Sequence, residues 1–359
     1  MSYENSFVGF NYICVNPEKF FMKSRITLKE LAKLLNVSVS TVSKALNDSP
    51  EISPKTIQRV KELAALHKYR PNPTAVNLKS SKSGTIGVLI PNIANSFFAK
   101  VLSGMEARAQ REGLQVITYI SNESHEREKQ IAEMLTSGFV DGVLIAIAEE
   151  TQRMKDFDHI RNIIQYDIPV VLYDRIDFDM PVDKVGIDDR RVFYDATRDF
   201  QKKGLKKIGL ATSIHHMGVG KARIEGYKEA LGDEYSFFIA NSAKMESLKE
   251  KILKMLLEDK VEAVLCSDFD STMLTYRLAY ENGRKIPEDL KLIGFIRGGL
   301  AKYLTPSVSF VDQFPDKIGE KAMDILINRV NRKNTGPKEK IVIDTEVVHY
   351  ESSRFSEKV

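Results

Sequence analysis

The 359-residue sequence contains very little cysteine. Its two cysteines, Cys14 and Cys266, lie far apart, with neither the spacing of a zinc site nor the number that a disulfide framework needs. We therefore expect no bound metal and no cofactor. So few cysteines are most simply explained by a reducing compartment, the cytoplasm.

Long apolar runs are also absent. No stretch reaches the roughly 18 consecutive apolar residues that suggest a membrane span, and residues 1–22 lack the basic and apolar regions of a signal peptide. The sequence thus predicts neither secretion nor a membrane partner. Residues 1–24 are interpreted as an N-terminal extension: either Met22 is the native start, or the segment is a loosely docked arm.

The common enzyme motifs are missing as well. GVGK at residues 218–221 lacks the upstream glycine and the following Ser or Thr of a P-loop, and we interpret it as a turn before a helix. No GxGxxG follows the first predicted strand, and no GxSxG occurs. His215 and His216 are adjacent rather than spaced as in HExxH, which favours an exposed loop. The protein is not expected to be an enzyme.

The net charge of +4 is distributed unevenly. Residues 23–83 carry twelve Lys or Arg against four Asp or Glu, a balance of +8, so the rest of the chain is mildly acidic. A small basic head on an acidic body is typical of a head that binds a polyanion, although a charge run is also common on a solvated face.

Residues 25–71 contain three helix starts. Thr27 has capping-box spacing to the glutamate three residues later, Ser38 can cap a second helix that runs to about Asn47, and Ser53 stands before a first-turn proline of a third helix. Two short helices joined by three residues and closed by a third form a helix-turn-helix unit. The outward face of the second helix carries no acidic residue, as binding in a polyanionic groove requires.

These residues resemble the head and hinge of the LacI/GalR family of bacterial repressors. The motif VSxxTVSxALN, the SPKT turn and YRPNPxAxxLK follow one another at family spacing, and the family pattern extends over residues 25–352. The resemblance implies that double-stranded operator DNA is the partner of the head.

The resemblance also implies which residues bind DNA. Val39, Ser40 and Lys44 would face base edges in the major groove, while most other head positions would contact phosphates. Residues 72–83 would form a hinge helix and linker, with Leu78 wedging a base step in the minor groove. The predicted DNA-binding residues are Thr27, Ser38, Val39, Ser40, Thr41, Ser43, Lys44, Asn47, Ser53, Thr56, Asn72, Ala75, Leu78 and Lys79.

From Thr85 onward, apolar strand-like runs alternate with amphipathic helical stretches. This alternation predicts parallel sheets covered by helices on both faces. The predicted fold class is α/β: a small all-α helix-turn-helix head plus a doubly wound core of two subdomains, which by resemblance is like that of periplasmic binding proteins. The core, residues 84–359, is divided into 84–186 with 314–334, and 187–313 with 335–359.

Polar and aromatic residues follow several of the predicted strands. Ligands of open parallel sheets bind beyond the carboxyl ends of the strands, and carboxylates, amides, an arginine and aromatic rings suit a polyhydroxylated small molecule. The candidate effector-binding residues are Asn92, Asn95, Phe97, Ser121, Asp174, Arg223, Asp268, Arg297 and Gln313.

Some of these candidates have alternative interpretations. By resemblance Arg223 is a bidentate ligand clamp and Asp268 binds sugar hydroxyls, but a surface position for Arg223, a helix cap at Asp268 and a core position for Phe97 stay open. Arg297 departs from the family, which usually has an aspartate or a small polar residue there. A cation at this position would admit an anionic ligand such as a sugar acid or phosphosugar.

Together these features predict a transcriptional regulator, a repressor by resemblance, that binds operator DNA as a homodimer. A small-molecule effector, a sugar or sugar derivative between the two subdomains, would control its operator affinity. The alternative is a periplasmic-type sugar-binding protein, which shares the core but needs a signal peptide and has no basic head. Residue types do not distinguish an effector that releases DNA from one that promotes binding, because the family contains both.

Overall fold

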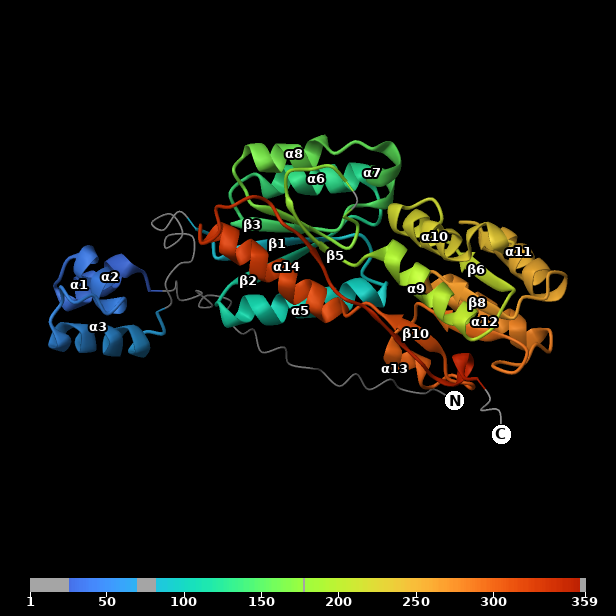
Figure 1. Cartoon of the computed structure of the whole chain (residues 1–359). Coiled ribbons are helices and arrows are strands. Elements are labelled where there is room, and N and C mark those ends of the chain that lie inside the picture. The colour runs from blue at the N-terminus through green and yellow to red at the C-terminus, as the bar shows by residue number, and fades with distance from the viewer. Residues whose placement is uncertain (1–25, 70–81, 177, 356–359) are drawn as a thin grey trace, which may run out of the picture. The chain divides into compact units, whose positions relative to one another are not determined.

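The computed structural model describes residues 26–69, 82–176 and 178–355. The chain divides into two compact units, Met1–Ser80 and Ser81–Val359, and each is described by itself (Figure 1). The predicted N-terminal extension lies outside the described residues. So do most of the predicted hinge and its candidate residues Asn72, Ala75, Leu78 and Lys79, and these stay predictions.

The head consists of three helices, α1 (Leu28–Leu35), α2 (Val39–Leu46) and α3 (Pro54–Leu66). The Thr27 backbone N–H donates to Glu30 Oε2 at 2.6 Å, and Thr27 Oγ1 accepts from the Glu30 N–H at 3.2 Å. Ser38 Oγ and Ser53 Oγ accept from the N–H three residues later, at 3.0 and 3.3 Å. These bonds satisfy amides that a helix start leaves free, so all three predicted caps are confirmed.

One small apolar cluster holds the head together. Its buried members are Leu31, Ala32, Val42, Ala45, Val60 and Ala64. Asn36 ends α1 in the left-handed conformation, with φ of 55°, and turns the chain toward α2. The opposite side of α2, including Val39 and Ser40, is exposed, as the helix-turn-helix prediction requires.

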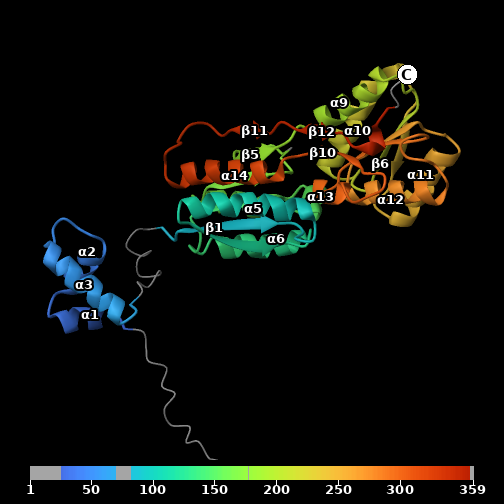
Figure 2. The ribbon, with the colours of Figure 1, turned by 90° about the horizontal axis from the view of Figure 1, so that it is seen from below.

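The first lobe of the core is a six-stranded parallel sheet in the order β11-β5-β4-β3-β1-β2. Its strands are β1 (Thr85–Ile90), β2 (Gln115–Ile120), β3 (Gly142–Ile145), β4 (Val170–Tyr173), β5 (Asp183–Gly186) and β11 (Lys340–Val342). Its helices are α5 (Ser96–Arg111), α6 (His125–Leu135), α7 (Glu149–Met154), α8 (Asp158–Gln165) and α14 (Pro315–Val330). Helices α5 and α14 cover one face of the sheet and α6 and α8 the other; Figure 2 shows β1 between α5 and α6.

The second lobe repeats this plan in the order β12-β10-β9-β8-β6-β7, except that β12 runs antiparallel to β10. Its strands are β6 (Ile208–Thr212), β7 (Phe238–Asn241), β8 (Ala263–Cys266), β9 (Lys291–Gly294), β10 (Ser309–Asp312) and β12 (Glu346–Val348). Its α-helices are α9 (Asp189–Lys202), α10 (Gly218–Leu231), α11 (Met245–Leu257), α12 (Phe269–Glu281) and α13 (Gly298–Ala301). Helices α9 and α10 cover one face, and α11 and α12 cover the other. The predicted doubly wound core of two subdomains is confirmed.

The chain crosses between the lobes after β5, after β10 and after β11. The crossing segments are residues 187–188, 313–314 and 343–345. The assignment of all of 335–359 to the second lobe is wrong for β11, because Lys340–Val342 pairs with β5 of the first. A strand of three residues carries too little pattern to indicate its sheet.

Residues 218–221 form the first turn of α10, and the prediction of a turn before a helix is wrong. A Cβ on Gly220 would lie 2.0 Å from the Ile214 carbonyl oxygen, so close backbone contact explains this glycine. A second close backbone contact of this kind lies between α14 and α5, where a Cβ on Gly319 would lie 2.0 Å from the Val101 carbonyl oxygen. Side chains at these positions would force the elements apart.

Candidate functional site

The outer face of α2 presents short polar side chains and one cation. Val39 and Ser40 are exposed at its first turn, and Asn47 at its end donates from Nδ2 to a carbonyl of the preceding turn at 2.9 Å. Lys44 is half-buried and forms an ion pair with Glu51. A phosphate or base edge that binds Lys44 therefore has to compete with this carboxylate.

Ser43 lies half-buried in the middle of α2, and the other candidate residues described in the head gather at helix starts. Thr27, Ser38 and Ser53 are the caps, and the hydroxyls of Thr41 and Thr56 each lie 2.8 Å from the cap hydroxyl of their own helix. Amides and hydroxyls at helix N-termini favour anions, because the helix dipole is positive there. The head therefore offers several phosphate-compatible positions around α2.

A cleft of about 220 Å³ lies between the two lobes of the core. Its wall includes seven candidate effector-binding residues: Asn95, Phe97, Asp174, Arg223, Asp268, Arg297 and Gln313. Two candidates are not part of the wall. Asn92 is exposed and its Oδ1 accepts from the Ala94 N–H at 2.9 Å, while Ser121 is fully buried. Ser121 directly follows β2 and Asn92 is the second residue after β1, but a residue past a strand end can also belong to a loop or to the interior.

The wall also contains Phe98, Lys100, Arg175, Phe269, Phe295 and Asp312, which the candidate list does not include. The sequence already places Phe98 and Arg175 past the ends of predicted strands, and Phe295 and Asp312 stand at the ends of β9 and β10, where the strand-end rule could have found them. Lys100 lies one turn inside α5, and nothing in the sequence distinguishes it from any other surface lysine.

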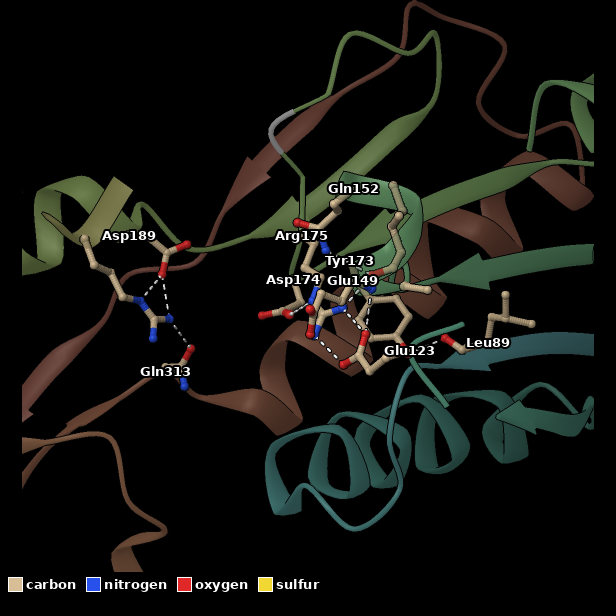
Figure 3. Close-up of polar contacts among 12 residues, drawn as sticks. Leu89, Glu123, Glu149, Gln152, Tyr173, Asp174, Arg175, Asp189 and Gln313 are labelled. Atoms are coloured by element: carbon tan, nitrogen blue, oxygen red, sulfur yellow. Dashed lines mark hydrogen bonds and ion pairs between the residues drawn. The ribbon is translucent and has the colours of Figure 1, made fainter. Parts of the chain in front are cut away.

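Arg175 binds within the first lobe. Its guanidinium is 6% exposed and donates to both Glu123 oxygens, at 2.7 and 2.8 Å, and to the Ile147 carbonyl oxygen at 2.7 Å. It also lies 5.6 Å from the Phe98 ring centroid. Glu123 in turn accepts from the Glu149 N–H at 2.7 Å, so this arginine fixes the start of α7 beside the cleft (Figure 3).

Arg223 binds within the second lobe and to the second crossing segment. It is 5% exposed, and its Nε and Nη2 lie 2.8 and 2.6 Å from Asp189 Oδ1, just past the first crossing. Its Nη2 donates to Gln313 Oε1 in the second crossing at 3.5 Å, and Nη1 donates to the Ser267 carbonyl oxygen. The surface interpretation of Arg223 is wrong, because the Asp189 carboxylate holds the side chain inside the cleft wall. Phe295 lies beneath its guanidinium, 4.0 Å from ring centroid to Cζ.

Asp268 serves as the N-cap of α12. Its two oxygens accept four hydrogen bonds, from the Ser213 N–H and hydroxyl, the Ser267 hydroxyl and the Ser271 N–H, at 2.8–3.0 Å. A carboxylate has about four acceptor positions. The alternative interpretation as a helix cap is therefore confirmed, and little acceptor capacity is left for a ligand.

Asp174 is the carboxyl group of the cleft with the weakest pairing. Its Oδ2 lies 3.7 Å from Arg175 Nε, and its backbone adopts a positive φ of 65°. Burial raises the pKa of Asp174 to about 7, against the opposing charge of Arg175 and with a smaller raising effect from Asp189. In Figure 3 the carboxyl group points from Arg175 toward the side of the cleft that carries Asp189 and Gln313.

The adjacent histidines do not form an exposed loop as predicted. Both are half-buried, and His216 Nε2 of the second lobe lies 3.0 Å from Glu149 Oε1 of the first. Burial lowers the pKa of His215, with the neighbouring histidine adding to the effect. Within the described ranges, no three His, Cys, Asp or Glu side chains converge as metal ligands would. No helix in those ranges has the length and apolar character that crossing a bilayer requires.

Two family models match the chain in adjacent segments. Residues 27–72 match "Bacterial regulatory proteins, lacI family", and residues 83–350 match "Periplasmic binding proteins and sugar binding domain of LacI family". The match of the head supports a regulator rather than a periplasmic binding protein, which has no such head.

Individual relatives give the same result. Catabolite control protein A of Priestia megaterium is 28% identical over 86% of this chain and 93% of its own length. The HTH-type transcriptional repressor PurR of Vibrio atlanticus is 29% identical over the same shares. The Lac repressor dimer bound to operator and the anti-inducer ONPF superposes with a TM-score of 0.80 at 18% identity, covering 91% of this chain and 99% of that one. The chain belongs to the LacI family of DNA-binding transcriptional regulators.

Proposed function

We propose that this regulator is a homodimeric repressor that binds a near-palindromic operator. A sugar or sugar derivative, bound in the cleft between its lobes, would control its affinity for that operator. The observation that carries the proposal is the position of Arg223. This buried cation lines the cleft and binds both Gln313 in the second crossing segment and Asp189, the residue that directly follows the first. A ligand that takes hydrogen bonds from Arg223 therefore acts where the lobes are joined.

The polar chemistry of the cleft supports a sugar-like ligand. Amide, carboxyl and guanidinium groups alternate along its wall with the rings of Phe97, Phe98, Phe269 and Phe295. Rings of this kind stack on the apolar face of a sugar while polar groups bind its hydroxyls. The family model that covers the core also carries the description of a sugar-binding domain.

Coupling to DNA would follow from the relative position of the lobes. A ligand that favours one arrangement of the lobes shifts the spacing of two heads in a dimer, which changes operator affinity by about 1–3 kcal/mol. The Lac repressor to which this chain is similar is a dimer on its operator, and one helix-turn-helix reads too few base pairs alone. The proposed binding to operator DNA is expected to take place in the cytoplasm.

The proposal is tested by selecting duplexes that bind the full-length protein from a random DNA library. We expect a near-palindromic site, bound at least 10³-fold more tightly at 50 mM than at 200 mM salt, because the basic head displaces counterions. Candidate sugars are then added to the complex, and release or tightening of the DNA is measured. Failure to bind any duplex at low salt, or indifference of the complex to every ligand bound by the core, contradicts the proposal.

Two substitutions, one at Lys44 in α2 and one at its ion-pair partner Glu51, make that test specific. Lys44→Ala should weaken binding of the selected site by about 1–3 kcal/mol, because one charged contact is lost. Glu51→Gln should strengthen binding, because it frees Lys44 from its carboxylate partner. The matched control is Gln58→Ala, an exposed position of α3 that hydrogen-bonds only to Glu62 of the same helix among the described residues.

A further inference from the structure

The cationic groups of the cleft wall fall into two classes. Arg175 and Arg223 are buried and are each neutralised by a carboxylate, Glu123 and Asp189 respectively. Lys100 and Arg297 are exposed, and within the described parts of the chain neither has a hydrogen-bond or ion-pair partner. The cleft therefore presents two positive charges that nothing in those parts of the protein satisfies.

The wall also contains three acidic groups, and none of them forms an ion pair with Lys100 or Arg297 among the described residues. Asp268 already accepts four hydrogen bonds from its own lobe. Asp174 is partly protonated near neutral pH, because burial raises its pKa to about 7. Asp312 is the third carboxyl group, and one of its oxygens accepts from the Phe314 N–H at 2.8 Å. Charges in a cleft between low-dielectric walls act on a ligand more strongly than charges on an open surface.

The two free cations belong to different lobes. Lys100 lies on α5 of the first lobe, and Arg297 lies just before α13 of the second. Both line the same cleft, whose volume is below the roughly 300–1,000 Å³ of pockets that bury drug-sized ligands. A ligand of about monosaccharide size therefore suits the volume of a cleft that both lobes line.

We propose that the effector is an anionic sugar derivative whose phosphate or carboxylate group is held between Lys100 and Arg297, with its hydroxylated body on Arg223 and Gln313. This inference rests on the proposed function, since it assumes that the cleft takes a sugar-like ligand. One anion bound by cations of both lobes holds the lobes together, which a neutral sugar does only through its hydroxyls. The anion would then be the part of the effector that sets the arrangement of the lobes.

The proposal is tested by titration calorimetry on the full-length protein with matched neutral and anionic probes. Glucose and ribose are compared with glucose 6-phosphate, ribose 5-phosphate and gluconate, and inorganic phosphate reports on the anion site alone. We expect the anionic sugars to bind at least tenfold more tightly than their neutral parents, since hydrogen bonds between charged groups are stronger than those between neutral groups. Comparison of the phosphates with gluconate shows which anion the site prefers.

Substitutions then locate the anion. Lys100→Ala and Arg297→Ala should each weaken binding of the preferred anionic sugar about tenfold and reduce its advantage over the neutral parent. Lys302→Ala, which removes an exposed lysine next to α13 that is not part of the cleft wall, should change affinity by less than twofold. Tighter binding of neutral sugars, equal affinity of wild-type and substituted protein, or no binding of any anionic probe at millimolar concentration overturns the proposal.

The DNA selection on the unsubstituted protein is an independent measurement. If no operator is found, the proposed function fails whatever binds in the cleft. If an operator is found and only neutral sugars alter its binding, the proposed function stands and the anionic effector is wrong.

Discussion

Arg175 and Arg223 face the same cleft from opposite lobes but bind different parts of the molecule. Each is buried, each stacks on a phenylalanine and each is paired with a carboxylate. The acceptors of Arg175 all belong to the first lobe, whereas Arg223 binds Gln313 of the second crossing segment as well as Asp189 and Ser267 of its own lobe. The first arginine thus stabilises a wall, and the second connects the ligand site to the joint between the lobes.

The partners of the two arginines also differ in their access to water. The Asp189 side chain is 6% exposed, while that of Glu123 is 27% exposed. A carboxylate that loses its cation regains hydration only if it can reach solvent. Two residues that look equivalent in the cleft wall should therefore respond differently to substitution.

The largest effect is expected for Arg223→Met. It leaves the Asp189 carboxylate buried without a counter-charge and should lower the free energy of unfolding of the core by about 3–5 kcal/mol. Arg175→Met should cost about 1–3 kcal/mol, because Glu123 can rehydrate. Urea unfolding followed by circular dichroism measures both, since the chain contains no tryptophan for fluorescence.

A double variant provides the control for that difference. Adding Asp189→Asn to Arg223→Met removes the stranded charge and should restore part of the lost stability. Equal losses of unfolding free energy for Arg223→Met and Arg175→Met would contradict the prediction. They would show that the different burial of Asp189 and Glu123 does not determine the cost of losing the arginine.

The next effect concerns Asp174, the first-lobe carboxyl beside Arg175. Its usual pKa of 3.8 is raised to about 7 in the folded protein, so the folded state binds a proton that the unfolded chain has released. Its contribution to stability is therefore complete below about pH 4 and is lost as the pH rises to about 7. Asp174→Asn should remove this dependence and make the core about 2–4 kcal/mol more stable at pH 8.

Urea titrations at pH 5 and pH 8 measure this prediction. The free energy of unfolding of the wild-type protein, relative to that of Asp174→Asn, should be lower at pH 8 than at pH 5. A constant difference would mean that Asp174 is ionised throughout and that the first lobe offers the ligand a full negative charge.

The smallest effect is expected for the contact between lobes at Glu149 and His216. The two side chains are 39% and 30% exposed, and pairs this accessible to water contribute less than about 1 kcal/mol. Glu149→Gln should therefore change stability by less than that amount in the same urea measurement. A loss above 2 kcal/mol would identify this contact, rather than Arg223, as the main link between the lobes.

The parts of this structure that were predictable are those with strong local signals. The caps at Thr27, Ser38 and Ser53 are set by hydrogen bonds within four residues, so spacing alone reveals them. The longer strands are apolar because helices cover both faces of each sheet, and such runs stand out in the sequence. Asp174 and Gln313 of the cleft were found because each directly follows a strand.

The parts that were missed depend on contacts distant in sequence. Strands β5, β11 and β12 have only three or four residues, and pairing with neighbouring strands, not an apolar run, establishes them. The buried position of Arg223 depends on Asp189, 34 residues away. Saturation of Asp268 depends on Ser213, 55 residues away, which no motif links to it.

The three crossings between the lobes have a consequence for the synthesis of this protein. The head is complete by the end of α3 at Leu66, so it can fold while most of the chain is still unmade. The first sheet receives its last strand only with Lys340–Val342 and the second only with Glu346–Val348. The two sheets therefore receive their last strands almost together, and a chain that stops before residue 340 carries a complete DNA-binding head but neither lobe of the core in finished form.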